Sequence, residues 1–172
     1  MIDFDLTKIR ALVFDVDGVL AAQTLPMDAD GQPSRTLNVR DGYALQLAVK
    51  KGLHVGIITG AKTEQVRRRY EGLGIRHIYM ASAVKTRDMD DFLRLTDLTP
   101  DEVLYMGDDI PDYEVMQRVG LPVCPADAAA EVKSVARYVS PMAGGYGAAR
   151  DVIEQVMKAQ GLWMSSAEAF GW

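Results

Sequence analysis

Cysteine, long apolar runs and basic charge are all scarce in this chain of 172 residues, and each scarcity excludes a class of protein. The single cysteine, Cys124, cannot form an internal disulfide or a cysteine-based metal site. No stretch reaches the roughly 18 consecutive apolar residues that a membrane-spanning helix needs. The opening residues MIDFDLTKIR lack the apolar core of a signal peptide. We therefore expect a cytoplasmic protein with no membrane partner.

Basic residues are outnumbered, with 19 lysines and arginines against 24 acidic residues and a formal net charge of −5. Non-specific binding of nucleic acid needs a basic surface, so we expect no nucleic-acid partner. The two histidines, His54 and His77, have no other ligands at useful spacing, and we interpret them as structural. What the chain does have is 48% hydrophobic and 25% charged residues, enough for one globular domain with a buried core.

Short apolar runs alternate with helical segments along the chain. The runs are apolar on both faces and bounded by Gly, Asp or Pro, which is typical of parallel strands covered on both sides. Strands are predicted at 11–14, 55–58, 77–80, 103–106, 121–124 and 138–140, and helices at 41–51, 62–73, 84–96, 111–119, 128–136 and 147–160. This alternation predicts an α/β fold, a doubly wound parallel sheet, in a single domain over residues 1–172.

Two segments fall outside that alternation. Residues 21–37 separate the first predicted strand from the first helix, and their central DADGQ is a turn signal. We therefore predict a β-hairpin that projects from the sheet. The tail 161–172 carries three aromatic residues, which are costly to leave in water. Docking of this tail onto a neighbouring molecule is our interpretation.

Reactive side chains follow four of the predicted strands. The carboxyl ends of parallel strands converge on one crevice, where such folds bind ligands. The sequence therefore predicts one site that holds a carboxylate pair, a hydroxyl, a cation and a second acidic cluster. In chain order these residues are Asp15 and Asp17 in VFDVDGVL, then Thr59, Gly60 and Lys85, then Asp108, Asp109 and Asp112 in GDDIPD.

So many acids can share a pocket only around a cation, and all-oxygen ligands favour Mg²⁺. Asp15 and Asp108 would bind this ion through their carboxylates. Asp15 could also attack phosphorus as a nucleophile, while Asp17 would protonate the leaving alcohol and then activate water. Thr59, with the backbone beside it, and Lys85 would hold the phosphoryl oxygens.

Other interpretations use the same residues. A calcium loop of the EF-hand type needs glycine at its sixth position and glutamate at its twelfth, whereas DVDG puts Gly18 fourth and Pro26 twelfth. A receiver domain also gathers Asp, Thr and Lys around Mg²⁺, but its phosphorylated Asp lies on the third strand, where this chain offers no acid. A non-catalytic phosphatase-like module would be expected to have lost Asp15, Asp17 or Lys85.

The ordered motifs DVDGV, TG, Lys85 and GDDIPD resemble those of the haloacid dehalogenase-like phosphatases, which have a Rossmann-like fold. The resemblance implies that Asp15 is the nucleophile, that Asp17 is the acid/base and that Mg²⁺ is obligatory. It further implies that Asp17 gives its backbone carbonyl to the metal, and that Asp109 and Asp112 support the site.

The segments between these motifs are too short for a folded cap domain. The stretch from Asp15 to Thr59 holds only the predicted hairpin, a helix and a strand, and that from Thr59 to Lys85 little more than a helix and a strand. We therefore expect a capless enzyme, which must exclude water by another route, such as a partner subunit.

Four longer stretches narrow the resemblance to the 3-deoxy-D-manno-octulosonate 8-phosphate phosphatases. This branch implies hydrolysis of that sugar acid phosphate in lipopolysaccharide precursor synthesis. It also implies a homotetramer whose hairpins and tails close neighbouring active sites, and it places Arg40 and Asp41 near the sugar. The stretches are NVRDGYALQLAVKKG, IITGAKTEQVRRR, GDDIPDYEVMQRVGL and AGGYGAARDVIEQVMKAQG.

Two departures leave the length of the sugar open. Ala61 stands where this branch has arginine and where a related branch, acting on nine-carbon sialic-type sugar phosphates, has glutamate. Tyr146 replaces the arginine of the usual GGRG. The run Arg67, Arg68 and Arg69 could contact a sugar carboxylate at a subunit interface or form a solvated helix face.

Overall fold

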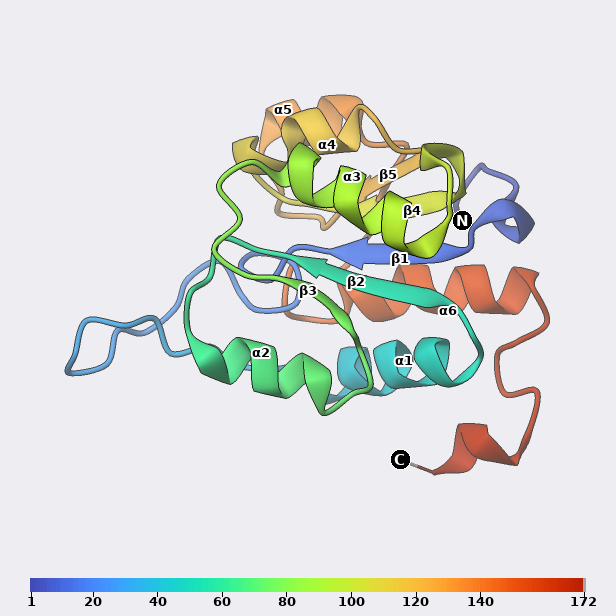
Figure 1. Ribbon diagram of the computed structural model, residues 1–172, viewed down its shortest axis with the longest axis horizontal. Coiled ribbons are helices and arrows are strands. Elements are labelled where there is room, and N and C mark those ends of the chain that lie inside the picture. Colours follow the sequence, from blue (N-terminus) through green and yellow to red (C-terminus); the bar gives the residue numbers. More distant parts are fainter. Residues whose placement is uncertain (172) are drawn as a thin grey trace.

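The computed structural model describes residues 1–171 and is built around one six-stranded sheet (Figure 1). All neighbouring strands are parallel, which confirms the predicted sheet. The order is β3-β2-β1-β4-β5-β6, so the chain leaves β1 in both directions and a crevice opens between β1 and β4. The strands are β1 (Ala11–Phe14), β2 (His54–Ile58), β3 (His77–Tyr79), β4 (Val103–Met106), β5 (Leu121–Cys124) and β6 (Tyr138–Val139).

Helices cover both faces of the sheet. Figure 1 shows α1, α2 and α6 on one face and α3, α4 and α5 on the other. Side chains alternate along β1, so that Leu12 and Phe14 join one buried cluster and Ala11 and Val13 the other. The helices are α1 (Val39–Lys50), α2 (Glu64–Glu71), α3 (Lys85–Thr96), α4 (Tyr113–Met116), α5 (Ala130–Val135) and α6 (Ala148–Ala159).

The fourth predicted helix, 111–119, is shorter than expected. It consists of a 3₁₀ turn, η3 (Ile110–Asp112), followed by the single turn of α4. The chain then turns tightly into β5 at Gly120, where a Cβ atom would collide with the backbone of Asp101. This close approach ends the helix before residue 119.

The segment 21–37 projects from the sheet as a hairpin-like loop, at the left of Figure 1. Asp28 accepts hydrogen bonds from the backbone of Asp30 and Gln32, at 3.0 and 2.8 Å, and so forms the predicted turn. The two arms meet at an antiparallel bridge between Met27 and Pro33 instead of forming regular strands. Proline explains the difference, because it cannot donate to a strand ladder.

The C-terminal tail packs on the chain's own helices. Its last turn, η4 (Ala167–Phe170), lies beside α1, where the Tyr43 hydroxyl donates to the carbonyl of Ala169. The guanidinium of Arg150 on α6 stacks on the rings of Tyr43 and Trp163, 5.4 and 4.4 Å from their centroids. Phe170 is exposed. Among the described residues, no helix has the length and apolar character to cross a membrane.

Candidate active site

Three buried carboxylates meet where β1 and β4 end. Asp15 directly follows β1, and its backbone N–H donates to the carbonyl of Met106 in β4, at 3.1 Å. Asp108 follows β4, and Asp112 ends η3. Oxygen atoms of Asp15, Asp108 and Asp112 all lie within 4.8 Å of one another. The adjacency of two parallel strands therefore gathers acids that are far apart in the sequence.

Lys85, at the first position of α3, contacts two of these three carboxylates. Its ammonium lies 2.7 Å from Asp15 and 2.6 Å from Asp112. The buried hydroxyl of Tyr105 donates to the same Asp112 oxygen at 2.6 Å, and the other oxygen accepts from the backbone of Asp108 at 3.1 Å. Both oxygens of Asp112 are thus engaged, which makes Asp112 the anchor of the cluster.

The cluster carries an excess of negative charge. Burial, followed by repulsion from Asp112, raises the pKa of Asp15 to about 6 and that of Asp108 to about 7. Burial opposes the charge of Lys85, but the carboxylates of Asp15 and Asp112 outweigh it and raise the pKa of that ammonium. Crowded oxygen ligands of this kind fit a hard divalent cation. Asp15 and Asp108 could hold such a cation. Both line a hollow of about 470 Å³, the acidic hollow, together with Asp17, Asp109 and Asp112.

Gly18 shapes the floor of this hollow. Its φ of +82° is a conformation that favours glycine, and a Cβ atom would collide with the carboxylate of Asp108. The backbone after Asp17 can therefore pass close to the acids only because residue 18 has no side chain.

The carboxylate of Asp17 points to a different partner. It forms a two-pronged ion pair with Arg35 of the hairpin-like loop, with distances of 2.6 Å to Nε and 2.7 Å to Nη2. Arg35 also donates to the hydroxyl of Thr63 at 3.0 Å. Sequence reasoning missed Arg35, because an isolated arginine in a loop carries no periodic or motif signal.

Thr59 and Gly60 follow β2, the other neighbour of β1. Thr59 is buried, and its hydroxyl accepts a hydrogen bond from the backbone of Ala61 at 3.1 Å. Asp109 lines the acidic hollow together with Asp15 and Asp108. The sheet thus brings the predicted phosphate-binding and acidic residues to the same edge.

Arg40 and Asp41 do not line the hollow that holds the acidic cluster. Arg40 lines a separate hollow of about 440 Å³ together with Tyr146 and Arg150. Asp41 is buried and accepts the backbone N–H of Arg150 at 2.7 Å, in the first turn of α6. Burial raises the pKa of Asp41 to about 6 despite this hydrogen bond. The carboxylate therefore ties α1 to α6 within the chain.

The three arginines of α2 have different surroundings. Arg67 and Arg68 pair with Glu71 and Glu64 on the same helix, at 3.9 and 3.7 Å. Arg69 lines a hollow beneath the hairpin-like loop that it shares with Arg35.

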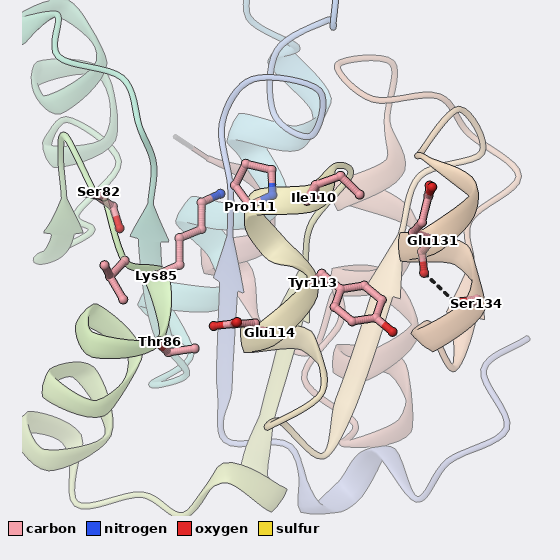
Figure 2. A pocket seen from close by; sticks show the side chains of 11 residues that line it. Ser82, Lys85, Thr86, Ile110, Pro111, Tyr113, Glu114, Glu131 and Ser134 are labelled. Carbon is pink, nitrogen blue, oxygen red and sulfur yellow. Dashed lines mark hydrogen bonds between the residues drawn. The ribbon is translucent and has the colours of Figure 1, made fainter.

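A further hollow, of about 550 Å³, opens beside Lys85 (Figure 2). It lies between the start of α3, with Val84 exposed, and the η3–α4 segment, with Ile110 exposed. The buried acids described above line the neighbouring hollow, and Pro111 lines both. Lys85 also links the two, because its ammonium contacts Asp112 of the neighbouring hollow.

Comparisons with known proteins agree with this geometry. A family model described as haloacid dehalogenase-like hydrolase matches residues 77–150. The 3-deoxy-D-manno-octulosonate 8-phosphate phosphatase KdsC of Escherichia coli K12 is 41% identical over 154 residues, which are 90% of this chain and 82% of the relative. The chain belongs to this family of haloacid dehalogenase-like phosphatases.

Solved structures of the phosphatase family share the whole fold. The 3-deoxy-D-manno-octulosonate 8-phosphate phosphatase of Yersinia pestis superposes with a TM-score of 0.88 at 35% identity, over 92% of this chain and 85% of that one. The enzyme of Moraxella catarrhalis, solved with magnesium, phosphate and KDO, gives 0.90 at 28% identity, over 97% and 96%. These matches confirm the capless α/β fold and the resemblance drawn from the motifs, and they argue against a receiver domain.

Proposed function

We propose that this phosphatase hydrolyses 3-deoxy-D-manno-octulosonate 8-phosphate to the free sugar acid and phosphate, with Mg²⁺, in lipopolysaccharide precursor synthesis. The observation that carries the proposal is the buried cluster of Asp15, Asp108 and Asp112 around the ammonium of Lys85. It occurs in a chain that is 41% identical to the KdsC phosphatase of Escherichia coli.

Asp15 is the proposed nucleophile. One of its carboxylate oxygens attacks phosphorus and the bond from phosphorus to the sugar oxygen breaks, which leaves an aspartyl-phosphate. Asp17, after taking up a proton from solvent, gives it to the departing sugar oxygen and, as the carboxylate, then takes one from a water molecule. That water attacks phosphorus, releases phosphate and restores Asp15.

The remaining residues hold charge in place. Asp15, Asp108 and the backbone carbonyl of Asp17 would hold Mg²⁺, which when bound supplies positive charge beside the phosphoryl group. Lys85 already contacts Asp15 at 2.7 Å and can neutralise a phosphoryl oxygen beside it. Thr59 and the backbone of Gly60 would bind another, while Asp109 and Asp112 support the site.

Contact of Arg40 and Asp41 with the sugar remains a prediction. Asp41 is tied to the backbone of α6, so its part would be to fix the start of α1, from which Arg40 extends. A measurable rise in KM for the sugar acid phosphate in Arg40→Met, with kcat retained, would support a contact by Arg40. An unchanged KM would remove Arg40 from the site.

We further propose that residues 1–172 form a single phosphatase domain and assemble as a cytoplasmic homotetramer. A capless site needs a second wall to exclude water, and the loop 21–37 projects from the sheet beside Asp17, where a neighbouring subunit could meet it. Light scattering after size-exclusion chromatography tests this assembly. A monomer that is fully active at high dilution would contradict it.

The substrate test compares phosphate release from the eight-carbon 8-phosphate and from a nine-carbon 2-keto-3-deoxy sugar acid 9-phosphate, each with Mg²⁺ and with chelator. We expect a kcat/KM at least tenfold higher for the eight-carbon ester, and no release in chelator. A preference for the nine-carbon ester would move the enzyme to sialic-type sugar synthesis. Turnover of neither would overturn the proposed function.

A further inference from the structure

Arg35 is held rigidly at the edge of the acidic hollow. Two of its nitrogens contact the two oxygens of Asp17, at 2.6 and 2.7 Å. The third, Nη1, donates to the Thr63 hydroxyl at 3.0 Å and to the carbonyl of Pro33 at 3.3 Å. Only 11% of the Arg35 side chain is exposed, compared with 38% for that of Asp17. The guanidinium is thus the fixed member of the pair, and Asp17 is the member that faces solvent.

The ion pair lies between two hollows. Asp17 lines the acidic hollow beside Asp15, and Arg35 lines a hollow of about 450 Å³ beneath the loop 21–37. Two cationic residues, Arg35 and Arg69, line that second hollow, together with the acidic residues Asp28 and Asp30 of the turn. Asp28 accepts backbone hydrogen bonds of the turn, whereas Arg35 holds the Asp17 carboxylate. Because Asp17 is the proposed acid for the departing oxygen, a phosphate ester with its phosphorus at Asp15 meets the Asp17–Arg35 pair on the side of its leaving group.

The mechanism sets the distance from Arg35 to that leaving group. Asp17 must approach the departing oxygen to within a hydrogen bond, and Arg35 is already one hydrogen bond from Asp17. The guanidinium therefore lies at most about 8 Å from the departing oxygen, which is two hydrogen-bond lengths and the width of the carboxylate between them. A sugar ring spans such a distance, so the far end of a sugar phosphate can reach Arg35.

We propose that Arg35 recognises the carboxylate of the substrate, which replaces the carboxylate of Asp17 on the guanidinium. This inference rests on the proposed function, because it needs a sugar acid as the substrate. The exchange replaces one two-pronged carboxylate pair by another, so no hydrogen bond of the guanidinium is lost. It also releases Asp17 to turn toward the departing oxygen. A sugar phosphate without a carboxylate would have to break the Asp17–Arg35 pair without a replacement.

A simpler role for Arg35 predicts a different result. If Arg35 only positions Asp17 or fastens the loop 21–37, its removal impairs every phosphate ester by the same factor. If it binds the substrate carboxylate, its removal impairs the sugar acid phosphate more than an ester that lacks the carboxylate. The ratio of kcat/KM for two such esters therefore separates the two roles.

The experiment measures that ratio for 3-deoxy-D-manno-octulosonate 8-phosphate and D-arabinose 5-phosphate, which has no carboxylate. We compare wild type, Arg35→Met, Arg35→Lys and the control Arg94→Met. Arg94 pairs with Asp91 at 2.6 Å on the exposed side of α3, so it matches Arg35 as an arginine–aspartate pair away from the site. Thermal unfolding verifies that each variant is folded.

In Arg35→Met we expect the ratio to fall about 10- to 100-fold, as loss of a charge-assisted hydrogen-bond pair requires, chiefly through KM for the sugar acid phosphate. Arg35→Lys should recover part of it, and Arg94→Met should leave it within about twofold of wild type. An unchanged ratio, whether kcat/KM falls equally for both esters or for neither, would overturn the inference while the proposed function stands. A wild type that does not hydrolyse the sugar acid phosphate would overturn both.

Discussion

Replacing Lys85 by methionine removes the positive charge from the acidic cluster and keeps a side chain of similar length. The ammonium lies 2.7 Å from Asp15 and 2.6 Å from Asp112, and all three side chains are buried. Methionine would leave those carboxylates facing each other and Asp108 without compensation. The perturbation is therefore electrostatic, with little change in packing volume.

The expected cost follows from the burial of the pair. Removing one partner of a buried ion pair destabilises a protein by about 3–5 kcal/mol. The pKa of Asp15 is already raised to about 6 with Lys85 present, and removal of the Lys85 charge should raise the pKa of Asp15 further. A carboxyl group whose pKa is higher in the folded than in the unfolded state lowers the stability only at pH values at which it ionises. The penalty in Lys85→Met should hence be near its full value at pH 7.5 and smaller at pH 5.

The assay is urea unfolding followed by circular dichroism at both pH values, with and without Mg²⁺. Mg²⁺ should restore part of the stability of Lys85→Met, because a bound cation replaces the lost charge and favours the folded state. Lys158→Met is the matched control: Lys158 lies 2.6 Å from Glu154 on an exposed helix face, so its loss should cost less than about 1 kcal/mol. The reasoning is refuted if Lys85→Met is as stable as this control at pH 7.5 without Mg²⁺.

Three further substitutions test other parts of the account. Gly18→Ala places a Cβ against Asp108 at φ +82° and should lower the rate of phosphate release by about 100-fold or more, as misplacement near the reacting atoms does; a near-normal rate would contradict the close approach. Asp41→Asn removes a carboxyl group whose pKa is about 6 in the folded protein and 3.8 ordinarily. The free energy of unfolding of wild type should therefore fall by up to about 3 kcal/mol relative to that of the variant as the pH rises from 4 to 7. Urea unfolding across that range checks this, and a constant difference would count against it. Tyr105→Phe removes the 2.6 Å hydrogen bond to Asp112 and should lower the free energy of unfolding by about 1–3 kcal/mol, whereas an unchanged midpoint would show that Asp112 does not need the hydroxyl.

The sheet and the acidic cluster could be predicted because apolar patterning determines both. Runs such as ALVF and VLYM must be buried on both faces, which makes them parallel central strands. Once these strands are adjacent, the residues that follow them lie at one edge, so Asp15 and Asp108 meet without any further information.

Features that depend on the path of a loop could not be predicted in the same way. The partner of Asp17 is Arg35, whose position follows from how the loop 21–37 returns past Asp17 on its way to α1. In the sequence, Tyr105 was one more residue of the apolar strand run VLYM, and nothing there indicated that its hydroxyl holds Asp112. Asp41 stood in the sequence as a polar residue near a helix start, and only the packing of α1 on α6 shows that it is buried.

The most direct test of the account is the turnover of 3-deoxy-D-manno-octulosonate 8-phosphate by Asp15→Asn beside wild type, at saturating Mg²⁺. Asparagine keeps the size of the side chain and is a far weaker nucleophile, although its single acceptor oxygen can keep only one of the two contacts that the Asp15 carboxylate accepts, from the backbone of Val16 and from Lys85. The account predicts that wild type releases phosphate and that kcat in Asp15→Asn falls by about 1,000-fold or more, as loss of a covalent nucleophile requires. A variant within tenfold of wild type would contradict the assignment of Asp15 and the aspartyl-phosphate with it.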